Sequence, residues 1–302
     1  MINLSIIIPF KNDTESLFRL FDSIPKRDDI EIILVENSDS PLTKEQIGID
    51  RDYILLNADS ARYAGGARNV GLENAQGEWL VFADSDDFFT YDAFDKISVY
   101  LNSGYDLVYF GCNSVYADSM EQSDRHIFIN NNINGFLDGS FPEMRARLYH
   151  VVPWAKMIRR SLVEEFNIRF DEVIAANDVY FSTLVGYYAK SFHTDCSHIY
   201  VVTTRKGSLA NTWNIQILRS RYHVALKRNK FLKEHALGHL QVSVMIYLYK
   251  ALRLSVKTFF QFIHDAITYR QNIFIGWSNW LSSFQNLRSN NKKNKEYIID
   301  EK

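Results

Sequence analysis

Short runs of nearly continuous apolar residues, rich in Ile and Val, alternate with amphipathic segments in the first hundred residues. The runs occupy residues 4–10, 30–35, 53–56 and 79–83. Their length and continuity predict strands that are buried on both faces. Apolar positions recur at helical spacing over residues 14–24, before Pro25, and over residues 65–75, before the turn at Gln76 and Gly77. Strands that alternate with helices form βαβ units, so the pattern predicts an α/β fold with a mainly parallel sheet flanked by helices.

Polar residues follow three of these predicted strands. They are residues 11–13 (KND), 36–39 (ENSD) and 84–87 (DSDD). Ligands of open α/β sheets bind at the carboxyl ends of the strands, so we look for the site there. The chain has no GxGxxG and no GxxxxGK[ST], which disfavours a Rossmann dinucleotide enzyme and a P-loop NTPase.

The composition is that of an ordinary globular protein. The chain has 302 residues, of which 46% are hydrophobic and 23% charged, which is enough to bury a sizeable core without disulfides. The two cysteines, Cys112 and Cys196, form no CxxC and have no spaced His partner. A reducing cytoplasm therefore fits best. The apolar run at the N-terminus is too short for a signal peptide, and nothing marks the chain for secretion.

The charge is distributed unevenly along the chain. Residues 1–212 carry 19 Lys and Arg against 31 Asp and Glu, a net charge of −12, whereas residues 213–302 carry 15 against 5, a net charge of +10. We therefore expect two domains, with the boundary between residues 212 and 213. The basic part favours contact with an anionic surface, although neutralisation between the two halves explains the charges as well. Nucleic acid is disfavoured because the larger, acidic part would repel phosphates.

The basic C-terminal region is predicted to be mainly helical. Residues 240–264 are mostly apolar, but Lys250, Arg253 and Lys257 interrupt any span long enough to cross a bilayer. Aromatic and aliphatic residues repeat at helical spacing over residues 273–287, followed by the lysines of 292–295. Such a helix suits the plane of an anionic membrane, which predicts peripheral attachment through residues 240–302. Packing on the catalytic domain or in a homo-oligomer is the alternative.

The acidic cluster at residues 84–87 needs a cation. Asp84, Asp86 and Asp87 directly follow an apolar strand, and three carboxylates so close together repel one another. Mg²⁺ and Mn²⁺ prefer oxygen ligands, and Mg²⁺ is typically held by one or two carboxylates together with substrate phosphates. The cluster therefore predicts a divalent cation and a diphosphate ligand. The alternative is a solvated turn in which Ser85 or Asp86 caps the next helix.

Two blocks of sequence resemble the family 2 glycosyltransferases with the GT-A fold. The first runs from GGARNVGL at residues 65–72 to AQGEWLVFADSDD at residues 75–87, and the opening SIIIPFKN and the VENSDS after the second strand extend it. The second contains PWAK at residues 153–156, and NDVYF at residues 177–181. The resemblance implies a Rossmann-like GT-A domain over residues 1–212. It also implies a nucleotide-diphosphate sugar as donor.

The resemblance assigns roles to individual residues. It implies that Asp86 is a metal ligand together with Asp84, that Asp87 supports them, and that the cofactor is Mn²⁺ or Mg²⁺. It implies that Asp178 is the catalytic base, although Asn177 stands where the family has Glu. The residues expected to bind the donor are Pro9, Phe10, Glu36, Asn37, Arg68, Asp84 and Ser85. Asn37 replaces the usual second acid, and an ion pair with Asp84 or Asp87 is the structural alternative for Arg68.

Three further residues are candidates for substrate contacts. Trp154 could stack on an acceptor sugar with Lys156 beside it, or it could be a core tryptophan. Arg205 begins a basic turn over residues 205–208 that could close on the diphosphate, or be a solvated loop.

The acidic cluster predicts metal dependence, and the resemblance implies an inverting glycosyltransferase and the polysaccharide context that follows. The acceptor would be the hydroxyl of a glycan or of a lipid-linked molecule, in the synthesis of a bacterial-type surface polysaccharide. The enzyme would be cytoplasmic or peripheral on the inner face of the plasma membrane. Two other classes remain: a sugar nucleotidyltransferase, which would share the metal and the diphosphate but lack an acceptor base, and a non-catalytic membrane-associated scaffold.

Overall fold

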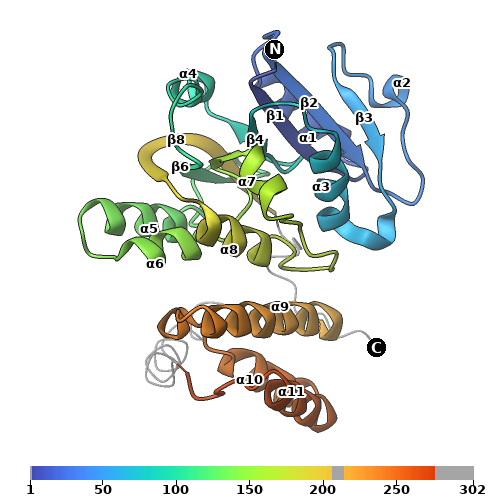
Figure 1. Cartoon of the computed structure of the whole chain (residues 1–302). Helices are drawn as coiled ribbons and strands as arrows, with labels where there is room; N and C mark the ends of the chain where they lie inside the picture. The colour runs from blue at the N-terminus through green and yellow to red at the C-terminus, as the bar shows by residue number, and fades with distance from the viewer. Residues whose placement is uncertain (1, 206–213, 276–302) are drawn as a thin grey trace. The chain divides into compact units, whose positions relative to one another are not determined.

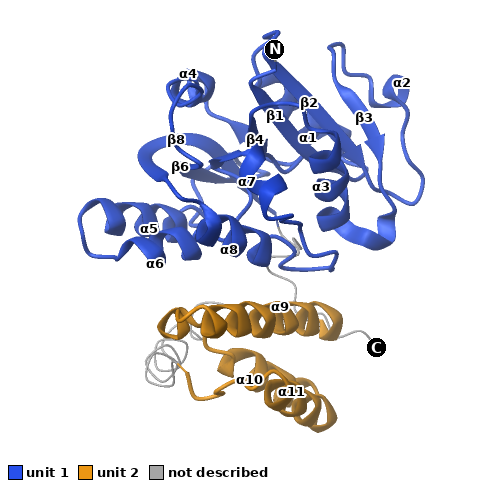
Figure 2. Ribbon diagram, viewed as in Figure 1, with its two compact units in different colours: residues 1–208 blue, residues 209–302 orange. Residues whose placement is uncertain are grey.

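The computed structural model describes residues 2–205 and 214–275, and the chain divides into two compact units, residues 1–208 and 209–302 (Figure 2). The strands of the first unit are β1 (Leu4–Phe10), β2 (Ile30–Glu36), β3 (Ile54–Asn57), β4 (Trp79–Phe82), β5 (Phe88–Phe89), β6 (Leu107–Tyr116), β7 (Lys156–Arg159) and β8 (Phe192–Thr204). Its helices are α1 (Thr14–Asp22), α2 (Lys44–Ile47), α3 (Tyr63–Asn74), α4 (Ala93–Ser98), α5 (Ile127–Leu137), α6 (Glu143–Tyr149), α7 (Arg160–Glu165) and α8 (Val179–Tyr188). The strands predicted from the apolar runs are confirmed to within one residue at each end.

These eight strands form one mixed sheet in the order β3-β2-β1-β4-β7-β6-β8-β5. Figure 1 shows the sheet with helices packed against it. The first four are parallel, as the βαβ pattern predicts. β7 is antiparallel to both β4 and β6, whereas β6 and β8 are parallel. In the register of the parallel half, Ile7 of β1 lies beside Ile33 of β2 and Phe82 of β4. The carboxyl ends of these strands therefore come to the same edge of the sheet.

Each face of the sheet carries its own hydrophobic core. Leu17 and Phe21 of α1 pack with Ile6 and Ile8 of β1 on one face. On the other face, helices α3 and α8 cover β1, β2 and β4. Helix α3 lies very close to the sheet, because a Cβ on Gly71 would lie 2.4 Å from a methyl carbon of Ile7. This packing fixes α1, α3 and α8 around the edge where the polar residues gather.

The second unit has a separate helical core. Its helices are α9 (Ile215–Glu234), α10 (Met245–Leu254) and α11 (Val256–Thr268), and the Tyr222 ring stacks on the Phe262 ring at 4.2 Å. The division of the chain between residues 208 and 209 lies four residues before the boundary expected from the charge pattern. Within the described ranges, every helix is too short or too polar to cross a membrane. Most of the aromatic segment 273–287 and the lysines of 292–295 lie outside the described residues.

Candidate active site

The acidic turn, residues 84–87, leaves the carboxyl end of β4 and is held by its backbone. The N–H of Asp84 donates to the Tyr200 hydroxyl of β8 at 2.8 Å. The N–H of Asp87 donates to the Asp84 carbonyl oxygen at 3.0 Å, which closes the turn. Three carboxylates are therefore fixed at one point of the sheet edge.

Asp87 is the internal member of the acidic turn. Only 2% of the residue is exposed, and its Oδ1 accepts from the Thr203 N–H at 2.7 Å and from the Thr203 hydroxyl at 3.2 Å. Burial raises the pKa of Asp87 well above its ordinary value, and the neighbouring charges of Asp86 and Asp84 add to the effect. This arrangement fits a supporting role.

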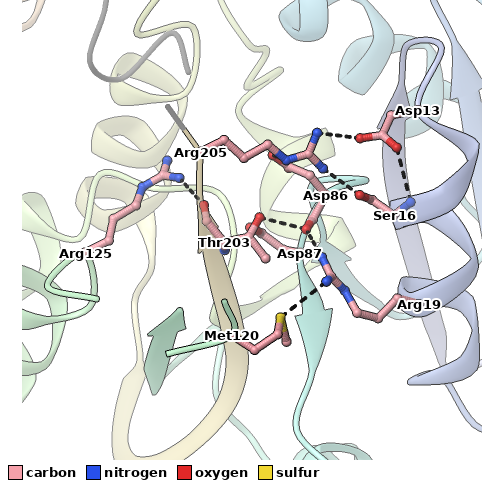
Figure 3. A network of polar contacts seen from close by, with 9 residues as sticks. All are labelled: Asp13, Ser16, Arg19, Asp86, Asp87, Met120, Arg125, Thr203 and Arg205. Atoms are coloured by element: carbon pink, nitrogen blue, oxygen red, sulfur yellow. Dashed lines mark hydrogen bonds and ion pairs between the residues drawn. The ribbon is translucent and has the colours of Figure 1, made fainter. Parts of the chain in front are cut away.

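The Asp86 side chain is partly exposed, and its backbone carbonyl is held by hydrogen bonds (Figure 3). The Asp86 carbonyl oxygen accepts from Arg19 Nη2 of α1 at 2.8 Å and from the Thr203 hydroxyl of β8 at 2.8 Å. The side chain is 38% exposed. Partial burial and the charge of Asp84 raise the pKa of the Asp86 carboxyl. A cation at this carboxylate would relieve that repulsion.

Arg205 closes one side of the acidic turn (Figure 3). Its Nη1 lies 2.6 Å from Asp13 Oδ2, its Nη2 donates to the Ser16 hydroxyl at 2.6 Å, and its Nε lies 3.9 Å from Asp86 Oδ2. Asp13 also caps α1, since its Oδ1 accepts from the Ser16 N–H at 3.2 Å. Arg205 therefore joins groups that follow β1, β4 and β8. The other residues of the expected basic turn, 206–208, lie outside the described residues.

Arg68 connects the acidic turn with the loop before α8. The arginine is buried in α3, its Nη2 donates to Asp84 Oδ1 at 2.5 Å, and its Nη1 donates to Asn177 Oδ1 at 2.9 Å. The ion pair with Asp84 is the structural alternative that the sequence left open. Helix α3 can approach the loop because a Cβ on Gly65 would lie 2.0 Å from the Asp171 carbonyl oxygen.

Asp178, the expected base, stands at the N-terminus of α8, next to Asn177. Burial raises the pKa of its carboxyl, and the charge of Asp84 acts in the same direction, whereas Arg68 and Lys156 lower the pKa. A carboxylate with a raised pKa is a better proton acceptor than an exposed one. The guanidinium of Arg68 thus joins the acidic turn to Asn177, the residue before Asp178.

Several residues expected to bind the donor are less exposed than such a role suggests. Pro9 is buried in β1, and only 1% of Phe10 is exposed. The Glu36 carboxylate is fully buried and accepts from the Ser38 N–H at 3.0 Å, the Ser38 hydroxyl at 2.9 Å and the Leu42 N–H at 2.6 Å. Glu36 therefore orders the loop after β2. Asn37 beside it is 5% exposed, and Ser85 in the acidic turn is partly exposed.

The two residues expected to contact the acceptor lie in the core. The Trp154 ring is 3% exposed and stacks on the Tyr200 ring at 5.5 Å, so Trp154 is a core tryptophan. Lys156 is fully buried, and its Nζ donates to the His150 carbonyl oxygen at 2.8 Å. An acceptor at the protein surface meets neither side chain in this arrangement. The core position of Trp154 is the alternative that the sequence left open, whereas the burial of Lys156 was not expected, because lysine side chains are usually exposed.

The donor set of the acidic turn fits a hard divalent cation. Asp86 and Asp84 supply carboxylate oxygens, although one oxygen of Asp84 is engaged by Arg68. Across residues 2–205 and 214–275, no group of three or more His, Cys, Asp or Glu side chains could hold a metal ion. The protein would therefore contribute one or two ligands and leave the others to phosphate oxygens and water, which is the arrangement typical of Mg²⁺.

Sequence reasoning missed three residues that shape the acidic turn. Arg19 lies on the amphipathic α1, Thr203 in the long apolar strand β8, and Tyr200 in the same strand. Nothing in their local sequence distinguishes them, because their partners are 67 to 117 positions away. Asp13 did carry a signal, since it follows the first predicted strand.

Comparison with known proteins finds relatives named as glycosyltransferases. The chain is 31% identical to uncharacterized glycosyltransferase EpsJ of Bacillus subtilis over 186 residues, which are 57% of this chain and 52% of that protein. It is 33% identical over 119 residues to a GalNAc(5)-diNAcBac-PP-undecaprenol beta-1,3-glucosyltransferase of Campylobacter jejuni, covering 37% and 38% of the two chains. The chain thus spans about half of the first relative and less than half of the second.

Solved structures share the fold. A fragment of Staphylococcus aureus TarS in complex with UDP-GlcNAc matches with a TM-score of 0.62 at 17% identity, over 89% of this chain and 81% of that one. The mannosyltransferase PcManGT of Pyrobaculum calidifontis, in complex with GDP-Man and Mn²⁺, matches with a TM-score of 0.55 at 16% identity, over 97% and 88%. The expected GT-A fold is confirmed. The family model described as glycosyl transferase family 2 matches residues 5–166, more than half of the chain, and the chain therefore belongs to this family.

Proposed function

We propose that the protein is a metal-dependent, inverting glycosyltransferase that moves a sugar from a nucleotide-diphosphate donor to a hydroxyl of a glycan or lipid-linked acceptor. One observation carries the proposal: Arg68 bonds both Asp84 of the acidic turn and Asn177 beside Asp178. Two carboxylate sites with different tasks are thereby held at one edge of the sheet. Relatives named as glycosyltransferases support the same reaction class.

The residues of this chain divide the work of the reaction. Asp86 and Asp84 would hold the divalent cation, which would supply positive charge to neutralise the departing diphosphate. Asp87, Thr203 and Arg19 keep the acidic turn in place. Asp178 accepts the proton of the acceptor hydroxyl as that oxygen attacks the anomeric carbon of the donor from the side opposite the leaving group. The new glycosidic bond then has inverted configuration.

A panel of nucleotide sugars tests this proposal. Purified full-length protein with Mn²⁺ is expected to release a nucleoside diphosphate from one donor, and a chelator is expected to stop the release. Asp178→Asn should lower kcat by about two to four powers of ten while donor affinity, measured by calorimetry, stays unchanged. Loss of donor binding together with turnover would contradict the role of Asp178. Pyrophosphate as product would indicate the nucleotidyltransferase alternative instead.

We also propose that the C-terminal unit attaches the enzyme to an anionic membrane on the cytoplasmic side. Three exposed apolar residues of α11 follow helical spacing, namely Val256, Phe260 and Ile267. Lys257 lies next to the first of them. The free thiols Cys112 and Cys196 suit a reducing compartment. Flotation with vesicles containing phosphatidylserine tests the idea, because Phe260→Ser should reduce co-flotation. A dimer in solution and no flotation would favour the homo-oligomer.

A further inference from the structure

Lys156 is a buried cation whose hydrogen-bond partners are all neutral. Its Nζ donates to the His150 carbonyl oxygen at 2.8 Å and to the Ser182 hydroxyl at 3.3 Å, and it lies 5.3 Å from the centre of the Tyr109 ring. None of the residue is exposed. Placing an ammonium among neutral groups costs free energy unless a negative charge nearby compensates for it. The negative charge of Asp178 raises the pKa of Lys156 and so stabilises this ammonium.

Helix α8 connects the two groups. Asp178 immediately precedes the helix, and the Ser182 N–H donates to the Asp178 carbonyl oxygen at 2.9 Å. Ser182 is therefore one turn beyond Asp178, and Lys156 holds this turn through the Ser182 hydroxyl. The Ser182 hydroxyl in turn donates to the Val152 carbonyl oxygen at 3.2 Å. Both sides of the Lys156–Ser182 contact are thus fixed to the backbone.

The backbone next to both charged residues adopts a conformation that alanine rarely takes. Ala155, directly before Lys156, has φ of 53°, and Ala176, two residues before Asp178, has φ of 61°. A non-glycine residue in the left-handed region is strained and persists only where the surrounding structure holds it. Two such alanines flank the two segments that carry the buried ammonium and the expected base.

We propose that Lys156 is a positioning residue for Asp178: its buried ammonium favours the ionised, proton-accepting form of the Asp178 carboxylate and anchors the first turn of α8. The inference rests on the proposed role of Asp178 as base. The other charged groups that act on Asp178 are Arg68 of α3 and Asp84 of the acidic turn. Arg68 has the larger effect on Asp178, but its guanidinium also bonds Asp84 and Asn177. Lys156 adds a second positive charge, and its own hydrogen bonds go to neutral groups.

The electrostatic coupling can be measured without any substrate. Burial lowers the pKa of Lys156 to about 7, and the charge of Asp178 opposes this shift. Coupling between two sites is reciprocal, so removing the Asp178 charge must lower the Lys156 pKa further. In the full-length protein labelled with ¹³Cε-lysine, the signal absent from Lys156→Met identifies Lys156. We expect Asp178→Asn to lower the midpoint of this signal by about one pH unit.

Asp92→Asn is the matched control, because Asp92 is an exposed carboxylate that pairs with Lys96. It should leave the Lys156 midpoint unchanged. A Lys156 midpoint that is the same in Asp178→Asn and in the unmodified protein would overturn the proposal, and so would a midpoint near the ordinary value for lysine. Neither result depends on glycosyl transfer, so the measurement stands even if the proposed function fails.

Kinetics then distinguish positioning from a purely structural role. Lys156→Met should move the acidic limb of the pH profile of kcat to higher pH by about one unit, because the Asp178 carboxyl loses a cation that lowers its pKa. Ser182→Ala removes a hydrogen bond but no charge, so it should leave the acidic limb in place. Lys156→Arg keeps the positive charge, so its acidic limb should lie between those of Lys156→Met and the unmodified enzyme. Equal limbs in Lys156→Met and the unmodified enzyme would contradict the proposal. If neither the unmodified enzyme nor any variant shows turnover, the proposed function fails. The NMR midpoint of Lys156 then still tests whether Lys156 and Asp178 are electrostatically coupled.

Discussion

Replacing Gly65 with Ala should push the acidic turn and Asp178 apart. A Cβ at this position would lie 2.0 Å from the Asp171 carbonyl oxygen and 3.2 Å from Asn177 Cβ. Real Cβ contacts essentially never fall below 3.0 Å, so the backbone must separate by at least 1.0 Å. Asp171 and Asn177 move together, because the Asp171 N–H donates to the Asn177 carbonyl oxygen at 3.1 Å. The displacement therefore reaches Arg68 and the start of α8.

The magnitude follows from two opposing effects. Overpacking of this kind costs about 1–3 kcal/mol, whereas Ala in place of Gly within a helix stabilises by about 1 kcal/mol. The net loss is about 1 kcal/mol, or roughly 2–4 °C in Tm for a unit of this size. Turnover should suffer more, because a misplacement of about 1 Å between catalytic groups can lower the rate by about 100-fold.

Thermal unfolding and release of nucleoside diphosphate, measured on the same preparation, test this reasoning. Gly104→Ala is the matched control, since a Cβ on Gly104 would meet nothing within 4 Å. It should match the unmodified protein in both measurements. A Gly65→Ala protein with unchanged turnover would refute the idea that the contact between α3 and the loop before α8 sets the geometry of the site.

Three further outcomes are expected. Asp86→Asn should weaken Mn²⁺ binding in the presence of UDP or GDP at least about tenfold by calorimetry, because the exposed carboxylate is the stronger ligand; unchanged affinity would exclude Asp86 as a ligand. Thr203→Val should lower the stability by about 1–2 kcal/mol, because the hydroxyl that serves Asp86 and Asp87 is lost, and Thr203→Ser should recover most of it in thermal unfolding. Burial and the charge of Lys156 lower the pKa of His150 well below its ordinary value, so the unfolded chain binds the extra proton first and stability falls as the pH drops below about 6.5. His150→Phe, which keeps a ring against Tyr109, should flatten this pH dependence, and an identical slope would show that His150 is not its source.

The parallel half of the sheet could be predicted because its strands are buried on both faces. Continuous apolar runs mark such strands directly, and the helices between them show their own spacing. The mixed half could not be predicted, because β7 has only four residues and pairs with β4 and β6 from about 80 and 50 positions away. Pairing over such a distance leaves no periodic trace in the local sequence.

Some residues of the candidate site could likewise be predicted from the sequence, and others could not. Asp84, Asp86 and Asp178 follow strands or start helices in recognisable patterns, and the structure brings them to one edge. Glu36 and Lys156 are polar residues that the fold buries, and a sequence shows the residue type but not its exposure. The role of Arg19 cannot be recognised in the sequence, because Arg19 contacts the backbone carbonyl oxygen of Asp86. Any residue at position 86 would offer the same carbonyl oxygen.

The position of β7 has a consequence for synthesis on the ribosome. β4 lies between β1 and β7, so until residues 156–159 have emerged, the nascent chain carries β4 with an unpaired edge. An open strand edge is a template for pairing with another chain. A fragment that stops short of β7 should therefore aggregate, and the block matched by the family model, residues 5–166, ends just after the strand that protects this edge.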